Sequence, residues 1–350
     1  MVKQKEVKKG KGQMSKHAAI WPFSAEQWKI MWLGKKKISI RFFPLRGSTF
    51  CLLASLLTRN MNPINFGINT LINRRYKIIS TLGHGHFATV FKVADAKEMD
   101  AVKACKISPI ADDPQWRHEL ELSILKKLDD SENWPELYDE FTSKKYKFLI
   151  ISDDGENIGS VLSRNKSGSV TNENSLRLCY KVYEALVDLH EVGYVHRNLS
   201  RDSVLVKLQD GDIKVTMSGL RMSAKLKNTE KYKSTSWFAS VHSMKGLHYT
   251  THDDFISMIY MVSEFAGFNV FPTWQQNLIQ AKSKFHSDPF AHLSNSHAWI
   301  GKILKFLDEM KEKGLSDMRG FRIHFETAIA DVAPESRITY RIVDDKLKLD

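Results

Sequence analysis

The sequence predicts an α+β protein with one large domain behind a basic N-terminal extension. Strand patterns gather in the first half of the domain, on both sides of a glycine-rich turn, and long helical patterns dominate the second half. The chain has 350 residues, of which 42% are hydrophobic and 11% aromatic. This length and composition are typical of a globular protein with a sizeable core.

The net charge of +12 arises in the extension. Residues 1–75 hold 15 of the 52 Lys and Arg but only 2 of the 40 Asp and Glu, which leaves 37 basic and 38 acidic residues in the rest. Residues 1–74 are therefore expected to be a basic, poorly ordered extension. Such an arm can bind nucleic acid or another acidic surface. The alternative is a solvated tail without a partner.

Within the extension, residues 27–33 have the spacing of a short helix, with Trp28, Met31 and Trp32 on one face. The apolar residues 38–57 are interrupted by charges, proline and glycine, so no transmembrane span is expected. A methionine at position 61 leaves open whether residues 1–60 belong to the native protein.

The three cysteines stand at wide, unrelated spacings. They fit neither a disulfide framework nor a metal site. Free thiols in a reducing, intracellular compartment are therefore expected, and the sequence does not distinguish cytoplasm from nucleus.

The domain opens with a strand, a glycine-rich turn and a second strand. Residues 76–82 alternate as a strand does, and residues 83–90 read GHGHFATV. This is close to G-x-G-x-x-G-x-V, with Ala88 at the third glycine. Glycines at Gly83 and Gly85 allow backbone N–H groups to approach phosphates. A hairpin turn without a ligand is the alternative interpretation.

A further strand and a helix supply a candidate charge pair. Residues 100–105 form the strand, and we favour Lys103 over Lys106 because Ala101 stands two residues before it. Residues 116–128 have a helical pattern that contains Glu121, with Glu119 as the alternative. Ordinary surface charge would explain either residue alone.

The remaining pattern alternates between strands, loops and long helices. Residues 146–152 are a buried strand, 153–157 a connecting segment, 163–174 a polar loop and 175–191 a long amphipathic helix. Residues 212–216 form a strand, and helices are expected over 255–265, 299–313 and 321–332.

Residues 194–206, YVHRNLSRDSVLV, resemble the catalytic loop of protein kinases, H-R-D-L-x-x-x-N. His196, Arg197 and Leu199 match, whereas Asn198 replaces the catalytic Asp and Ser203 the metal-binding Asn. Residues 217–220, MSGL, stand where a kinase has D-F-G-L, so Met217 replaces the metal-binding Asp and Ser218 the Phe.

Two further segments resemble the casein kinase 1 group in particular. Residues 238–242, FASVH, and 252–254, HDD, are similar to its F/Y-A-S-V-N-A-H and R-x-D-D signatures, and within this group the sequence most resembles the tau-tubulin kinases. The resemblance covers about residues 75–332. It implies a bilobal protein-kinase fold, with a small antiparallel-sheet lobe over about 75–152, a larger helical lobe over about 158–332 and a C-terminal tail over 333–350.

The resemblance also implies roles for individual residues. Gly83 and Gly85 would approach the phosphates of ATP, and Lys103 would contact the α and β phosphates while paired with Glu121. Asp254 would anchor the catalytic loop. The adenine ring would be enclosed by Val90, Ala101 and Leu205.

The departures from the kinase pattern are expected to remove the chemistry that the resemblance implies. Asn198 offers no basic carboxylate, and Ser200 stands where the loop lysine is expected. Magnesium prefers hard oxygen ligands, but Met217 offers a thioether and Ser203 only a neutral hydroxyl. Because phosphoryl transfer depends on positioning and electrostatic stabilisation, these losses should compound.

We therefore expect a pseudokinase that acts as a binding, scaffold or regulatory module for protein partners. Metal-independent binding of ATP is left open, and magnesium is not expected. One alternative is an active serine/threonine kinase with an unusual metal site. Another is a protein that binds an anionic polymer through its basic extension.

Overall fold

The computed structural model describes residues 31–33, 36–38, 64–85, 88–98, 101–111, 115–227, 231–269, 271, 277–315 and 318–350. The chain divides into two compact units, residues 1–50 and 51–350. In the first unit, β1 (Met31–Leu33) and β2 (Lys36–Ile38) pair as an antiparallel hairpin. The helix expected over residues 27–33 is therefore wrong for its last three residues. The other expectations for residues 1–63 lie outside the described residues.

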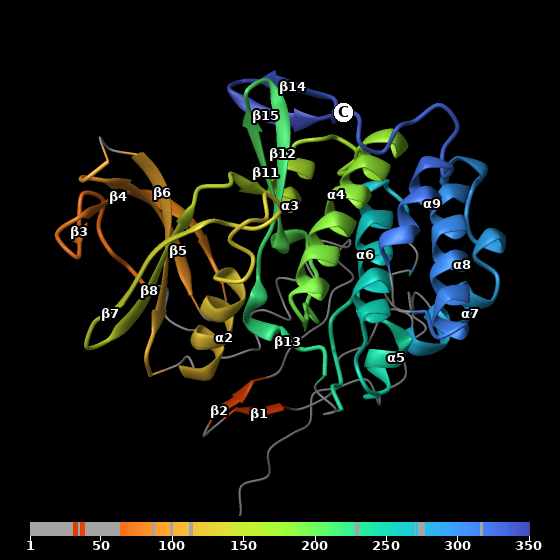
Figure 1. Ribbon diagram of the computed structural model, residues 1–350, viewed down its shortest axis with the longest axis horizontal. Coiled ribbons are helices and arrows are strands. Elements are labelled where there is room, and N and C mark those ends of the chain that lie inside the picture. The colour runs from red at the N-terminus through yellow and green to blue at the C-terminus, as the bar shows by residue number, and fades with distance from the viewer. Residues whose placement is uncertain are drawn as a thin grey trace, which may run out of the picture. The chain divides into compact units, whose positions relative to one another are not determined.

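The second unit contains a small lobe built on a six-stranded antiparallel sheet (Figure 1). The strand order is β3-β4-β5-β6-β8-β7. Helix α2 (Gln115–Leu125) lies beside this sheet and corresponds to the predicted helix. The strands are β3 (Leu71–Ile72), β4 (Tyr76–His84), β5 (Thr89–Asp95), β6 (Ala101–Pro109), β7 (Leu137–Thr142) and β8 (Tyr146–Ser152).

The two faces of this sheet have different surroundings. Phe91 and Val93 of β5 and Cys105 and Ile107 of β6 are buried together in an apolar cluster on one face. Leu149 of β8 packs instead in the larger core that includes α2. Successive residues of a strand point to opposite faces, so every side chain of β6 is assigned to one of these two environments.

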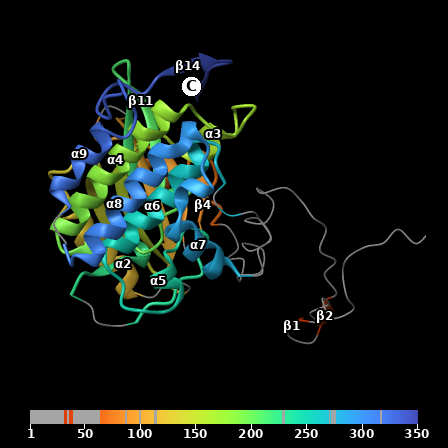
Figure 2. The same ribbon diagram turned by 90° about the vertical axis from the view of Figure 1, so that its right-hand side faces the viewer.

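The large lobe is mainly helical, and α4, α6 and α8 lie side by side at its centre (Figures 1 and 2). Thr171 caps α4 by accepting a hydrogen bond from the amide of Asn174. The helices are α3 (Ile158–Leu162), α4 (Asn172–Glu191), α5 (Val241–Met244), α6 (Thr251–Phe265), α7 (Leu278–Ser287), α8 (Ala298–Glu312) and α9 (Arg322–Glu326). In the described part of the chain, no helix is long and apolar enough to span a membrane.

Short strands connect these helices to the predicted catalytic loop. β11 (Val204–Gln209) pairs with β12 (Asp212–Met217) and with β9 (Glu156–Asn157), while β10 (Tyr194–Val195) pairs with β13 (Ala224–Lys225). Of two 3-10 turns, η2 (Arg201–Ser203) lies within the predicted loop and η3 (Leu220–Met222) begins at the last residue of the MSGL segment.

Both ends of the domain extend beyond the predicted limits. Ile64 and Ile72 are buried in the small-lobe cluster, so residues before 75 belong to the fold. Residues 333–350, expected to be a tail, contain the hairpin of β14 (Tyr340–Val343) and β15 (Lys346–Leu349). Leu349 is fully buried, and the Asn174 side chain donates to the backbone oxygen of Asp350 at 2.9 Å.

Candidate functional site

The glycine-rich turn joins β4 to β5. Gly83 pairs with Val90, and the amide of Gly85 donates to the carbonyl of Ala88 at 2.8 Å. Neither glycine has a positive φ, and a Cβ added at Gly83 would meet nothing within 4 Å. The protein's own geometry therefore does not require glycine at position 83. The open space above it suits the close approach of a ligand.

The predicted pair of Lys103 and Glu121 is wrong. Lys106 forms this pair: its Nζ lies 2.5 Å from Glu121 Oε1. Glu121 was correctly preferred to Glu119, which is exposed and accepts a hydrogen bond from Gln115. Burial alone would raise the pKa of Glu121, but the charges of Lys106 and Arg221 hold it below its ordinary value.

The alternation of β6 explains why Lys103 cannot reach Glu121. Lys103 lies on the same side of the strand as Cys105, on the face away from α2, whereas Lys106 lies on the face toward α2. Lys103 Nζ instead contacts Asp95 Oδ2 at 2.9 Å and Glu98 Oε2 at 2.6 Å. Arg75 also pairs with Asp95. Lys103 is thus part of a charge cluster on the opposite face.

The same alternation corrects the predicted adenine contacts. Ala101 has the parity of Lys103, so it points away from the face that carries Lys106. Ala104 lies two residues before Lys106 and shares its face. Val90 is paired directly with Lys106 across β5 and β6, so these two side chains share a face. Leu205 is half-buried on β11, between Asn157 and Thr216 on the neighbouring strands.

Arg221 is a site residue that no motif in the sequence indicated. It lies in η3, and its side chain is 7% exposed. Its Nε donates to Glu121 Oε2 at 3.1 Å, and another guanidinium nitrogen donates to the hydroxyl of Ser108. Glu121 therefore binds Lys106 through one carboxylate oxygen and Arg221 through the other.

Asp254 anchors the predicted catalytic loop, which confirms that expectation. Its carboxylate accepts the backbone amides of His196 at 2.7 Å and Arg197 at 2.9 Å. Burial would raise the pKa of Asp254, but its hydrogen bond with His190 and the neighbouring charges hold it below its ordinary value. His196 Nε2 in turn donates to the carbonyl of Ser218 at 2.9 Å, which links the loop to the MSGL segment.

Arg197 has a left-handed backbone conformation, with φ of 68°. Its guanidinium donates to the carbonyls of Met222 at 2.6 Å and Ser223 at 3.3 Å, and it lies 4.2 Å from the centre of the Tyr232 ring. The side chain therefore holds the segment that follows Gly219 through main-chain oxygens and an aromatic face.

The sequence resemblance places Asn198, Ser200 and Ser203 at three functional positions of the kinase pattern. Asn198 is exposed. The amide of Ser200 donates to Ser203 Oγ at 2.8 Å, and that hydroxyl donates to the carbonyl of Ser200 at 2.9 Å. The buried Ser203 hydroxyl is thus engaged within the turn η2. Among these three side chains there is no carboxylate that would serve as a base or a magnesium ligand.

Met217, which the sequence resemblance places at the second metal-ligand position, is part of the hydrophobic core. The side chain is fully buried, with 0% exposure, in the large apolar cluster. Its amide donates to the carbonyl of Asn133 at 2.8 Å. A charged ligand at this position would be surrounded by apolar groups.

The segment that joins the two lobes is held by lysines from both. Lys92 of β5 lies 3.1 Å from the Asp153 carboxylate, and Lys207 of β11 donates to the Asp153 carbonyl at 2.7 Å. Lys214 of β12 lies 3.1 Å from the Asp154 carboxylate. Both aspartates are buried. Because Lys92 belongs to the small lobe and Lys207 and Lys214 belong to the large lobe, these contacts link the connecting segment to each lobe.

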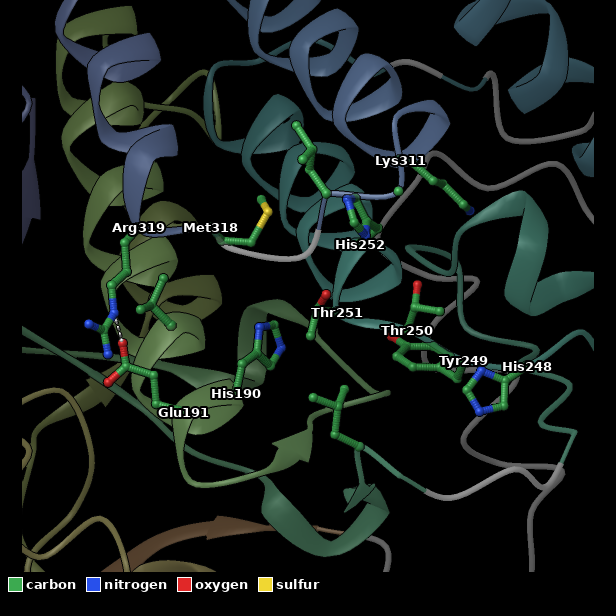
Figure 3. Close-up of a pocket in the computed structure, with 14 residues that line it drawn as sticks. His190, Glu191, His248, Tyr249, Thr250, Thr251, His252, Lys311, Met318 and Arg319 are labelled. Carbon is green, nitrogen blue, oxygen red and sulfur yellow. Dashed lines mark hydrogen bonds and ion pairs between the residues drawn. The ribbon is translucent and has the colours of Figure 1, made fainter.

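A pocket of about 680 Å³ lies where the end of α4, the segment before α6 and the end of α8 meet (Figure 3). None of the predicted site residues lines it. Two of its wall residues bind Asp254: His190 Nε2 donates to Oδ2 at 2.9 Å, and the Tyr249 hydroxyl donates to Oδ1 at 2.7 Å. Asp254 therefore connects two wall residues of the pocket with the predicted catalytic loop.

Comparison with known proteins identifies the family of the chain. The family profile described as "Protein kinase domain" matches residues 76–341. A Caenorhabditis elegans protein named "Putative casein kinase I" is 24% identical over 314 residues, which cover 84% of this chain and 84% of the relative. The calcium/calmodulin-dependent protein kinase type 1 of the same organism is 30% identical over 160 residues, 44% of each chain.

A solved structure of vaccinia related kinase 3 superposes with a TM-score of 0.63 and 18% sequence identity. The match covers 82% of this chain and 98% of that structure, and at this identity it establishes the bilobal fold. Together with the profile match over most of the chain, these similarities settle the family. The chain belongs to the protein kinase domain family and is related to the casein kinase 1 group.

Proposed function

We propose that this protein is a pseudokinase, nearest to the tau-tubulin kinases, that binds partners without transferring a phosphoryl group. The observation that carries the proposal is the burial of Met217 in the apolar core. A metal-binding carboxylate at this position would have to be placed among hydrophobic side chains, which is energetically costly. The loss is thus built into the packing of the large lobe.

Magnesium does not fit the residues at its two expected positions. Met217 presents a thioether inside the core, and the Ser203 hydroxyl is committed to Ser200. Magnesium requires oxygen ligands, usually carboxylates, in octahedral geometry. Asn198 likewise supplies no carboxylate to accept a proton from a substrate hydroxyl.

A nucleotide without metal fits better. Lys106, held by Glu121, would contact the phosphates, and the open space above Gly83 would admit them. Val90, Ala104 and Leu205 would enclose the adenine. Bound ATP would then act as a structural ligand that stabilises the closed lobes by mass action.

The test is a thermal-unfolding titration of the full chain with ATP, first in EDTA and then in magnesium. Equal stabilisation in both is the expected result. Stabilisation that requires magnesium would contradict the proposal. The same preparation is then incubated with labelled ATP and a protein substrate, with an active casein kinase 1 as positive control. Transfer of label by this protein that is lost in Lys106→Met would refute the pseudokinase assignment.

The partner is proposed to be another protein inside the cell. The two buried cysteines that the structure describes, Cys105 and Cys179, are free thiols, as a reducing compartment allows. Binding of nucleic acid or an acidic surface is proposed only for the extension. It predicts an affinity that falls steeply with salt and is lost when residues 1–60 are deleted.

A further inference from the structure

Arg221 joins three elements of the fold at one buried point. It stands in η3, two residues after Gly219, and it contacts Glu121 of α2 and Ser108 of β6. Gly219 has φ of 92°, a left-handed conformation that strains any residue with a Cβ. This turn directs η3 toward α2. The arginine therefore connects the segment after β12 to both main elements of the small lobe.

The chemistry of the contact favours arginine over a neutral residue. Glu121 is 4% exposed, and a buried carboxylate is costly unless a cation and hydrogen bonds compensate it. The guanidinium is planar and carries several donors, so it can bind Glu121 and Ser108 together. Lysine at this position would retain the charge but lack the second, fixed donor direction.

The carboxylate of Glu121 is divided between two cations. Lys106 Nζ binds Oε1 at 2.5 Å, and Arg221 Nε binds Oε2 at 3.1 Å. If Lys106 turns to an anionic ligand, Arg221 still neutralises Glu121. The buried carboxylate then keeps a partner, and α2 keeps its connection to the large lobe.

We propose that Arg221 is a positioning residue that holds Glu121 and α2 in place, so that Lys106 is available to a nucleotide phosphate without a metal ion. The part that concerns Lys106 rests on the proposed binding of nucleotide. The part that concerns α2 does not, because the contacts of Arg221 exist without any ligand. The two parts therefore have separate tests.

The first test is hydrogen exchange of the full chain without nucleotide. Arg221→Met should accelerate exchange of the amides of α2 (Gln115–Leu125) at least about tenfold relative to those of α4, since α2 loses a buried, charge-assisted contact. Arg221→Lys should give an intermediate rate. Arg319→Met is the matched control, because Arg319 is 70% exposed in a surface pair with Glu191 and should leave α2 unchanged.

The second test is calorimetric titration with ATP in EDTA. Arg221→Met should weaken binding about tenfold or more, with partial rescue in Arg221→Lys. In the double variant Lys106→Met/Arg221→Met, the fold loss of affinity for ATP should be smaller than the product of the two single fold losses, because both residues act through Glu121. If Arg221 had a purely structural role, Arg221→Met would change the exchange rates, but the loss of affinity in the double variant would equal the product of the two single losses.

The two tests separate this inference from the proposed function. Unchanged exchange of α2 in Arg221→Met would overturn the positioning role whatever the protein binds. Absence of ATP binding in the unmodified protein would refute the nucleotide part and the proposed ligand together, while accelerated exchange would still support the hold on α2. If Arg221→Met does not fold, Arg221→Lys replaces it in both measurements, and wild-type values for this variant would overturn the proposal.

Discussion

Substituting each of two nearby lysines in turn gives the sharpest prediction for the proposed nucleotide site. Lys103 and Lys106 lie on one strand, three residues apart, and therefore point to opposite faces. Lys106→Met removes the cation that faces α2, whereas Lys103→Met removes one that binds Asp95 and Glu98. We expect only Lys106→Met to reduce stabilisation by ATP.

The size of the effect follows from the charge of the contact. At an ATP concentration 100 times Kd, binding stabilises the folded state by about 2.7 kcal/mol. Loss of one charge-assisted hydrogen bond costs about 2 kcal/mol, which raises Kd about 30-fold. The stabilisation remaining in Lys106→Met at the same concentration is about 0.9 kcal/mol. With a shift of about 2–4 °C per kcal/mol in large domains, the rise in Tm falls from about 5–10 °C to about 2–4 °C.

Lys103→Met provides the matched control. Asp95 keeps its paired contacts with Arg75 at 2.7 and 2.6 Å, so we expect a loss of about 1–3 kcal/mol in the free energy of unfolding without ATP. The rise in Tm on adding ATP should be that of the unmodified protein. Thermal unfolding of the three proteins in EDTA measures both quantities. The reasoning is refuted if Lys103→Met abolishes the ATP-induced rise and Lys106→Met preserves it.

Three further perturbations test the packing around the site. Met217→Asp should lower the free energy of urea unfolding by more than about 3 kcal/mol, because an unpaired carboxylate enters the core. The control Met217→Leu should cost less than about 1.5 kcal/mol. Equal stability of Met217→Asp and wild type would contradict the apolar environment of this side chain. Asp254→Asn should cost at least about 2 kcal/mol and accelerate exchange of the His196 and Arg197 amides, and unchanged exchange there would argue against the anchoring role. Burial lowers the pKa of Lys282 to about 7, whereas this lysine in the unfolded chain has the ordinary pKa of about 10.4. Between about pH 7 and pH 10.4 the unfolded state therefore binds more protons than the folded state, and the free energy of unfolding rises with pH. Below pH 7 no such rise is expected. Measured against Lys282→Met by urea unfolding from pH 6 to pH 9, a difference that does not vary with pH would count against this assignment.

Elements with a strong local pattern could be predicted from the sequence. The strand at residues 146–152 has the predicted limits, and the long helix begins three residues before the predicted position, at Asn172. Its extra turn follows from the cap at Thr171. The hairpin of β14 and β15 was missed, although Asp344 and Asp345 in left-handed conformation form a two-residue turn that aspartate tolerates. A turn of this kind between alternating residues was the available signal.

The choice between the two lysines could not be made from spacing. Ala101 precedes Lys103 by two residues, and Ala104 precedes Lys106 by two, so the Ala-x-Lys pattern fits both. Only the pairing of β6 with its neighbours decides which residues face α2. The contact of Arg221 with Glu121 could not be predicted from the sequence for a related reason. This contact joins residues 100 positions apart, and nothing in the local sequence reports such a contact.

The contacts of Arg197 have a consequence for regulation by modification. Its guanidinium is already bound to the carbonyls of Met222 and Ser223 and covered by the Tyr232 ring. A phosphoryl group added to this segment would have to displace those contacts to pair with Arg197, so much of the gain from a new charge pair would be offset. The contacts of Arg197 with Met222, Ser223 and Tyr232 therefore form without a phosphoryl group. Under the proposed function, a partner that recognises this surface would meet Met222 and Ser223 already held by Arg197, without a preceding modification step.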